Sequence, residues 1–387
     1  MMTRMIPYLK PTVELTTLLR LMGGEATLPP EADKERFMVL VKKNRMELMA
    51  AENLAGGMPE TNRDEETLHM MRQVSMLGYL IRFFEKASIR CLSVKGPAMV
   101  LELYGILGLR SCHDLDLLVE KSQVDRATEL LQRDGWQWHE QQTLTTPKRL
   151  AESKHTQNHY LFRKGELYLE LHWRLLPWRC DAFEVLWTNR RKVTLGGAQV
   201  PVPGKVDQMY LQVVHNTRHG YHRLKWLADM LQMVRGSAGE MDILWRRMEK
   251  DDQQLMLLVA MLLLQRLPML EVPEAVFGGY RFSRTEQGVL VEAGRQGDKL
   301  LCKAQRLTDE LLSLMEGTGD REASPAYYHY FHQLPHPLNQ KYLPQRLLLR
   351  LRPRVWLWQW VDLPDGWYWL YWILRPVHKL WKILRGQ

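Results

Sequence analysis

Residues 95–120 read KGPAMVLELYGILGLRSCHDLDLLVE, and in this stretch charged residues interrupt an apolar pattern in a chemically meaningful order. Asp114 and Asp116 open a run that continues through the apolar residues 117–119. The run is typical of a β-strand, in which side chains two residues apart point to the same face of the sheet. The sequence therefore predicts two carboxylates side by side on one strand.

The segment before this strand predicts a turn at the amino end of a helix. Residues 91–94 have the pattern of a short strand, and Lys95-Gly96-Pro97 has that of a turn into a helix over residues 97–104. The Lys95 ammonium and the amide of Gly96 would then lie where the peptide dipoles of the helix attract phosphate. The alternative is a buried strand that ends in a solvated lysine.

The segments that follow extend the sheet. A helix is expected over residues 123–133 and a third strand over residues 135–138, and such alternation of strand and helix indicates a mixed α/β sheet. Residues 158–163 and 167–172 have the pattern of an antiparallel hairpin joined by a short turn. The predicted sheet therefore gains two further strands.

Glu170, on the second strand of the hairpin, supplies a third carboxylate. Its side chain shares a face of that strand with His172, two residues later. Three carboxylates on adjacent strands can hold one or two Mg²⁺ ions, which prefer oxygen ligands and can neutralise and align a triphosphate. The alternative makes Asp114 a turn cap, Asp116 an ion-pair partner of Arg110, and Glu170 a surface residue. Unpaired carboxylates beside an apolar wall would be costly, which favours the metal site.

Three histidines near the hairpin raise the question of zinc. His155, His159 and His172 are irregularly spaced, and two of them flank the hairpin. Structural zinc sites usually draw their ligands from short, regular spacings. The sequence therefore favours structural histidines, each fixed by a hydrogen bond, over a zinc site.

Three motifs, VKG, R-x-x-x-D-x-D-L-L-V and ELHW, resemble the uncharacterised bacterial nucleotidyltransferase family of the polymerase β-like superfamily. The resemblance implies transfer of a nucleoside monophosphate from an NTP to an unidentified acceptor, with Mg²⁺ or Mn²⁺. It implies three metal-binding catalytic residues, Asp114, Asp116 and Glu170. It also implies that Lys95, Gly96 and Arg110 contact the triphosphate.

A second segment extends the resemblance, because His215, Lys225 and Asp229 match the family's H…W-x-x-D pattern. These residues are expected to contact the nucleotide or the acceptor, although Asp229 could instead pair with Lys225 one helical turn earlier. Gly96-Pro97 replaces the family's usual Gly-Ser, which removes an amide and a hydroxyl from the phosphate cradle. The alternative function is therefore a catalytically weak nucleotide sensor, or an assembly partner in a surface-polymer or peptide-modification system.

Composition bounds the class of protein, and the predicted elements together with the resemblance imply the fold. The chain has 387 residues, of which 45% are hydrophobic and 25% charged, and its four cysteines form no CxxC pair, which favours a reduced, cytoplasmic setting. We expect an α+β protein with a small mixed-sheet nucleotidyltransferase core between an N-terminal helical segment and a C-terminal all-helical domain. The expected domains are an N-terminal helical subdomain at 1–64, the core at 65–203, a helical domain at 204–316, and a loop and Trp/Arg-rich tail at 317–387.

The tail carries most of the net charge of +9. Residues 340–387 contain nine Lys or Arg against two Asp, and they hold seven of the fourteen tryptophans. The rest of the chain is nearly neutral, which gives no strong nucleic-acid signal. The apolar runs are too short to span a membrane. We expect the aromatic residues either to pack back on the helical domain or to dock on a protein partner or peripherally on the inner face of a membrane.

Overall fold

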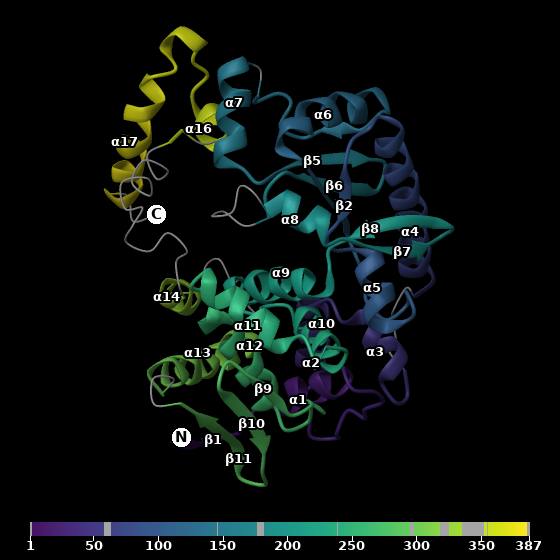
Figure 1. The fold of residues 1–387 in the computed structure, drawn as a ribbon, viewed down its shortest axis with the longest axis vertical. Helices are drawn as coiled ribbons and strands as arrows, with labels where there is room; N and C mark the ends of the chain where they lie inside the picture. Colours follow the sequence, from purple (N-terminus) through teal and green to yellow (C-terminus); the bar gives the residue numbers. More distant parts are fainter. Residues whose placement is uncertain are drawn as a thin grey trace. The chain divides into compact units, whose positions relative to one another are not determined.

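The computed structural model describes residues 2–57, 63–144, 146–175, 182–237, 239–294, 298–317, 325–334, 352–353 and 355–384. The chain forms two compact units, each assembled from separated segments. We call one the sheet unit, which comprises Tyr79–Lys95, His113–Thr188 and Leu338–Gln387. The other, the helical unit, comprises Met1–Gly78, Gly96–Cys112 and Asn189–Pro337. Figure 1 labels their elements.

The sheet unit is built on a five-stranded sheet with the order β2-β3-β6-β5-β4. Strands β3 and β6 are parallel, and the other neighbouring pairs are antiparallel. The strand bounds are β2 Cys91–Ser93, β3 Asp114–Val119, β4 Gln137–Trp138, β5 His159–Lys164 and β6 Leu167–His172. Leu115, Leu117 and Val119 of β3 are at most 1% exposed, so one face of this central strand lies in the core.

Helices complete the sheet unit. Helix α6 buries Val124, Ala127 and Leu131 at the spacing of one helical face. Burial of a leucine side chain such as Leu131 contributes about 2 kcal/mol to the free energy of folding. Helix α7 begins after Thr146, whose hydroxyl accepts a hydrogen bond from the Arg149 amide. The described helices here are η1 Lys121–Gln123, α6 Val124–Arg133, α7 Pro147–Thr156, α8 Ala182–Thr188, α16 Val355–Trp360, η3 Asp365–Trp367 and α17 Leu370–Leu384.

The helical unit is centred on α12, whose residues from Leu255 to Gln265 are all buried. Around it lie α9, α10, α11 and α13 (Figure 1). Its described helices are α1 Val13–Arg20, α2 Lys34–Asn44, α3 Glu47–Asn53, α5 Pro97–Tyr104, α9 Lys205–Arg218, α10 Leu224–Arg235, α11 Met241–Lys250, α12 Gln254–Gln265, α13 Asp298–Glu316 and α14 Pro325–Gln333, while α4 Arg63–Lys86 runs through both units.

Two small sheets also belong to the helical unit. Strands β7 Arg191–Leu195 and β8 Ala198–Val202 form a hairpin. A four-stranded sheet has the order β1-β11-β10-β9, with β1 Met2–Pro7, β9 Ala275–Phe277, β10 Tyr280–Arg284 and β11 Gly288–Ala293. The mixed α and β fold class is therefore confirmed, although the carboxy-terminal part is not helical throughout.

The expectation that the domain at residues 204–316 is all helical is wrong, for example at β11, which occupies Gly288–Ala293. Val289, Val291 and Ala293 are buried while the residues between them are half-buried, and this alternation is that of a strand. Strand β11 pairs on one side with β1, at the other end of the sequence. A local pattern could not reveal that partner.

The segment expected as a helical subdomain, residues 1–64, begins with strand β1, and its chain breaks between α2 and α3. Arg45 has a left-handed conformation with φ 54°. The side chain of the buried Asn44 donates to the Leu40 carbonyl over 2.8 Å and accepts from the Leu224 amide over 2.9 Å. A tertiary contact therefore stabilises the break.

The loop expected over residues 317–340 contains a helix, since α14 spans Pro325–Gln333. The fully buried Tyr330 anchors it, because its hydroxyl donates to the Thr217 carbonyl over 2.8 Å. Residues 318–324 and 335–340 of that expected loop lie outside the described residues.

Among the described residues, Cys91, Cys112 and Cys302 form no disulfide with one another, and Cys180 lies outside the described residues. Within the part of the chain that the structure describes, we find no helix that combines the length and the apolar character needed to cross a membrane.

Candidate functional site

Two carboxylates face one another across the parallel pair of strands in the sheet unit. Asp116 of β3 is the register partner of Glu170 of β6. Partners in register on neighbouring strands project from the same face, so the two acids lie side by side. Asp114 projects from that face as well, two residues earlier and opposite Tyr168. The structure therefore brings together Asp116 and Glu170, with Asp114 at the start of the same strand.

His172 joins the two acids. Its Nε2 atom lies 3.1 Å from Asp116 Oδ1 and 3.1 Å from Glu170 Oε2. The Nε2 atom of His159, on β5, lies 3.9 Å from Glu170 Oε1, and the two histidine rings are 4.8 Å apart between centroids. We call Asp116, His159, Glu170 and His172 the acid–histidine cluster.

The electrostatics of the cluster favour ionised carboxylates at Asp116 and Glu170 and a protonated His172 between them. Burial disfavours the charged form of Asp116, which is 5% exposed, but the charges of Lys95 and His172 lower the pKa of its carboxyl below the ordinary value. Burial opposes protonation of His172, yet hydrogen bonds to Asp116 and Glu170 raise its pKa to about 8. Near neutral pH, His172 is therefore largely an imidazolium between carboxylates.

The neighbouring charges also shift the pKa values of Glu170 and His159. Burial would raise the pKa of Glu170, but the hydrogen bond from His172 lowers it. Burial and the charge of His172 both lower the pKa of His159. His159 is thus mostly neutral at neutral pH, and a neutral imidazole is the form that can ligate a metal ion.

The cluster has the donors of a metal site. His159, Glu170 and His172 each offer one ligand atom, and these atoms all lie within 4.8 Å of one another. His172 would ligate a metal ion only after losing the proton that it holds near neutral pH. Carboxylate oxygens suit Mg²⁺ and Mn²⁺, whereas imidazole nitrogens suit Zn²⁺ and other transition-metal ions. Two of the three histidines weighed from the sequence are brought together here, so zinc becomes a candidate that the spacing did not favour.

The turn before α5 has the predicted backbone form. Gly96 has φ 77° and ψ −154°, a conformation that residues with a Cβ atom rarely adopt, and Gly105 closes the helix in the left-handed region. Pro97 occupies the first helical position and has no N–H to offer a phosphate. Lys95 is half-buried at the end of a sheet-unit segment, and its charge acts on Asp116.

Arg110 and Asp229 form a buried ion pair in the helical unit. Arg110 donates from Nε to Asp229 Oδ1 over 3.1 Å and from Nη2 to Oδ2 over 2.8 Å. The Tyr104 hydroxyl donates to Asp229 over 3.0 Å, and Lys225 donates to the Ser111 carbonyl over 3.3 Å. Three residues predicted to bind nucleotide, Arg110, Lys225 and Asp229, therefore meet in one buried network.

His215 belongs to an aromatic group on α9 and α10. Its ring centroid lies 4.9 Å from that of Trp226 and 4.5 Å from that of His219. The Arg223 guanidinium lies over the Trp226 ring, 5.7 Å from its centroid. Nucleotide binding by His215 stays a prediction.

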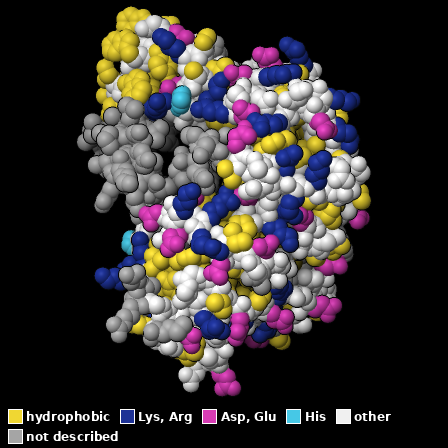
Figure 2. Space-filling model, viewed as in Figure 1, with side chains coloured by type: hydrophobic (Ala, Val, Ile, Leu, Met, Phe, Trp, Pro, Cys, Tyr) yellow, Lys and Arg dark blue, Asp and Glu magenta, His cyan; other side chains and the backbone are white. Residues whose placement is uncertain are grey.

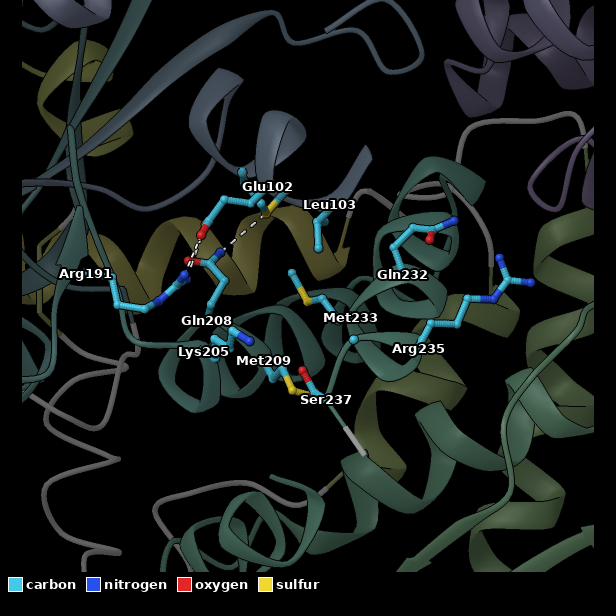
Figure 3. A pocket seen from close by; sticks show the side chains of 12 residues that line it. Glu102, Leu103, Arg191, Lys205, Gln208, Met209, Gln232, Met233, Arg235 and Ser237 are labelled. Atoms are coloured by element: carbon cyan, nitrogen blue, oxygen red, sulfur yellow. Dashed lines mark hydrogen bonds and ion pairs between the residues drawn. The ribbon is translucent and has the colours of Figure 1, made fainter. Parts of the chain in front are cut away.

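A separate cavity of about 380 Å³ lies among α5, α9 and α10 of the helical unit (Figure 3). Glu102 and Arg191 form an ion pair at its rim, and Gln208 donates to the Met99 sulfur over 3.3 Å. Its lining carries three cationic side chains and one acid. The cavity can accept an apolar group that carries an anion. It is lined by Met99, Glu102, Leu103, Arg191, Lys205, Gln208, Met209, Gln232, Met233, Arg235, Gly236 and Ser237.

The comparisons with known proteins give the class of this protein, a nucleotidyltransferase family. Residues 30–268 match a family model described as an uncharacterised nucleotidyltransferase, and the chain belongs to that family. The matched range contains every residue predicted above for the site. No curated protein matches the chain.

One solved structure is similar, that of an antigenic nucleotidyltransferase-like protein from Paracoccidioides brasiliensis. The sequences are 14% identical, and the match covers 46% of this chain and 87% of that one. The TM-score is 0.31, which is too low to carry a structural argument. Bacterial origin and membership of the polymerase β-like superfamily therefore stay expectations.

Sequence reasoning placed His172 on the face of Glu170 without pairing it with the acids, and it did not place His159 beside them. A signal was present for both. Lys164 pairs with Leu167 across the two-residue connection of the hairpin, and this register places His159 opposite His172. His172 also lies two residues after Glu170, on the same face. Counting back from the turn would have placed both rings beside the carboxylates.

Proposed function

We propose that the protein is a metal-dependent nucleotidyltransferase that moves a nucleoside monophosphate from an NTP to an acceptor yet to be identified. The observation that carries this proposal is the register pairing of Asp116 with Glu170 on parallel strands, inside the range that matches the family. Two ionised carboxylates on one face, with Lys95 acting on one of them, form a centre suited to a cation and a polyphosphate.

The residues fit a divalent ion. Asp116 is buried yet kept ionised, so it can ligate a cation without first losing a proton. We assign Asp114, Asp116 and Glu170 as ligands of Mg²⁺ or Mn²⁺. Such an ion, when bound, neutralises phosphate charge and helps to align the attacking and leaving oxygens.

The neighbouring residues have distinct roles in this proposal. Lys95 attracts phosphate oxygens, and Glu170 orients or deprotonates the acceptor hydroxyl. His172 holds Asp116 and Glu170 in place through its two 3.1 Å contacts. The buried Arg110–Asp229 pair positions α10 against the segment that ends α5 and leads towards β3, and this is a positioning role within the helical unit.

The experiment is a transfer assay with the full chain. The protein is incubated with ATP, GTP, CTP or UTP labelled at the α-phosphate, with Mg²⁺ or Mn²⁺ and a cell extract. We expect label to move to RNA, protein or a small molecule with release of pyrophosphate, and only when the divalent ion is present. Absence of transfer from all four nucleotides, although the folded protein binds them, would contradict the proposal.

The second candidate function is a nucleotide sensor or assembly partner in a surface-polymer or peptide-modification system. Pro97 at the first position of α5 favours it, because that residue offers the phosphate neither an amide nor a hydroxyl. Tight NTP binding without transfer, in the same assay, is the outcome that this function predicts.

The metal itself has two candidates. The carboxylates favour Mg²⁺ or Mn²⁺, whereas the His159–Glu170–His172 group favours Zn²⁺. Elemental analysis of the purified protein, before and after dialysis against a chelator, distinguishes them. Tightly held zinc that survives dialysis would replace Mg²⁺ in the proposal.

A further inference from the structure

The C-terminal segment of the sheet unit, α16 to α17, is fixed to α7 along one side. Arg149 of α7 forms an ion pair with Asp362, and it donates to the Leu363 carbonyl over 2.8 Å and to the Tyr371 hydroxyl over 3.0 Å. Thr146 donates to Asp365 over 2.5 Å. Tyr371 is fully buried. One side of the segment is thus held by specific contacts.

The other side of the segment presents large apolar side chains to solvent. Figure 2 shows hydrophobic side chains gathered over the C-terminal helices. The exposed fractions are 54% for Trp360, 58% for Trp367, 56% for Trp369, 52% for Ile373 and 52% for Val377. Contiguous exposed patches of this kind usually mark an interaction site. We call these five residues the tryptophan patch.

The spacing within the patch is that of one helical face. Trp369, directly before α17, and Ile373 and Val377 within it follow one another at four-residue intervals. The buried Tyr371 projects from the opposite side. Helix α17 therefore directs Tyr371 towards Arg149 of α7 and a stripe of apolar side chains towards solvent. A helix that served only the core would have the reverse orientation.

All the charged residues of helix α17 are basic. Residues 370–384 contain Arg375, Lys379 and Lys382 and no acid. The two acids of the segment, Asp362 and Asp365, are bound by Arg149 and Thr146. Tryptophan with lysine and arginine is the composition of helices that lie in the headgroup layer of an anionic bilayer.

We propose that the tryptophan patch and the basic residues of α17 dock the protein on the surface of an anionic membrane. Trp367 and Trp369 enter the boundary between headgroups and acyl chains, with Ile373 and Val377 beside them. The net positive charge of the segment attracts anionic headgroups. This inference does not depend on nucleotidyl transfer, because its test measures lipid binding only.

The test uses the full chain and two kinds of vesicle, phosphatidylcholine alone and phosphatidylcholine mixed with phosphatidylglycerol. We expect co-sedimentation with the mixed vesicles, weaker binding to phosphatidylcholine alone, and a loss of binding as salt is added. The double variant Trp367→Ser, Trp369→Ser should bind the mixed vesicles at least about tenfold more weakly. Lys379→Gln with Lys382→Gln should remove the preference for the anionic vesicles.

A matched control lies in the helical unit, where Ile243 and Val276 are each 51% exposed. Their double change to Ser removes two apolar side chains of comparable fractional exposure and should leave vesicle binding unchanged. Quenching of the unmodified protein's tryptophan fluorescence by brominated lipid gives a second readout, which does not depend on the folding of any variant.

Three outcomes would overturn the proposal. They are the absence of sedimentation and quenching with either vesicle, equal loss of binding in the control variant, and a concentration-dependent dimer that the Trp367→Ser, Trp369→Ser variant abolishes. The last would assign the patch to a second copy of the chain instead. Sedimentation and quenching that depend on both the anionic lipid and the patch would support membrane docking.

Discussion

Among single residues, His172 makes the contact on which the geometry of the acid–histidine cluster depends. It contributes one positive charge to two carboxylates, each 3.1 Å from the same nitrogen. Asp116 is 5% exposed and His172 is 8% exposed, so solvent compensates little if that charge is lost. Removing one partner of such a buried arrangement leaves an uncompensated charge, which is costly.

We therefore expect His172→Gln to lower the free energy of unfolding by about 3 kcal/mol in metal-free buffer. Millimolar Mg²⁺ or Mn²⁺ should restore part of that loss, because a cation bound by Asp116 and Glu170 stabilises only the folded state. Urea denaturation with and without the ion measures both effects. A destabilisation that neither ion relieves would contradict metal binding by the acids, and Glu129→Gln on the surface of α6 is the control.

Lys225 gives a pH-dependent prediction in the helical unit. Burial and the neighbouring Arg110 lower its pKa from 10.5 to about 7. Between these values the unfolded chain holds a proton that the folded chain lacks, so the free energy of unfolding should rise with pH across this window. Below pH about 7 both states are protonated, and the cost of the buried charge is fully present.

The variant Lys225→Met removes this group. Its free energy of unfolding should exceed that of the unmodified protein most at pH about 7, and the excess should shrink towards pH 10.5. Denaturation curves at several pH values across the window measure the difference. A constant difference between the two proteins would show that Lys225 titrates normally in the folded state.

Among the elements, those with a complete local signal were the predictable ones. Proline at the first helical position and a left-handed Gly105 at the end delimit α5, and its predicted and observed bounds agree. The apolar run after Asp114 likewise gave β3 its observed bounds. The shared face of Asp114 and Asp116 followed from the two-residue period of strands, whereas the alignment of Asp116 with Glu170 depends on the pairing of β3 with β6.

Elements whose stability comes from distant partners were not predictable. Strand β11 was expected to be helical from its local pattern. It forms a strand because it pairs with β1, which lies far away at the start of the chain. The break between α2 and α3 rests on a hydrogen bond from the Leu224 amide to Asn44. In the candidate site, the buried pairing of Arg110 with Asp229 had no signature in the sequence, because it joins residues on different elements.

Helix α5 offers a test at the scale of one element. Pro97→Ser keeps a residue that is tolerated at the first helical position and returns an amide and a hydroxyl to the turn. If the turn contacts phosphate, NTP affinity should increase by about tenfold, the effect of one hydrogen bond to a charged group. Pro147→Ser, at the first position of α7, is the matched control. Unchanged affinity in Pro97→Ser would remove the turn from the phosphate site.

For the whole molecule, the chain passes repeatedly between its two units, at residues 78–79, 95–96, 112–113, 188–189 and 337–338. A division of the sequence into consecutive domains cannot represent units built from separated segments. The reason is physical, since a unit is defined by which residues bury one another, and burial joins segments that are far apart along the chain.

Attachment of the C-terminal segment depends on Arg149, which is 2% exposed and bonded to Asp362, Leu363 and Tyr371. We expect Arg149→Met to release α16 and α17 from α7, because hydrogen bonds to a buried charge contribute about 1.5–3 kcal/mol each. Limited proteolysis with mass spectrometry should show faster cleavage within residues 352–384. Cleavage at the rate of the exposed control Arg133→Met would contradict this anchoring role.

The most direct test of nucleotidyl transfer at this site is the activity of Asp116→Asn. The change removes a ligating charge with almost no change in volume, and Glu129→Gln, on the surface of the same unit, controls for loss of a carboxylate elsewhere. The measurement is the rate of label transfer from an NTP labelled at its α-phosphate. We predict a loss of at least about a thousandfold in Asp116→Asn, with full activity in Glu129→Gln and an unchanged circular dichroism spectrum in both. Transfer at the unmodified rate by folded Asp116→Asn would contradict the assignment of the site.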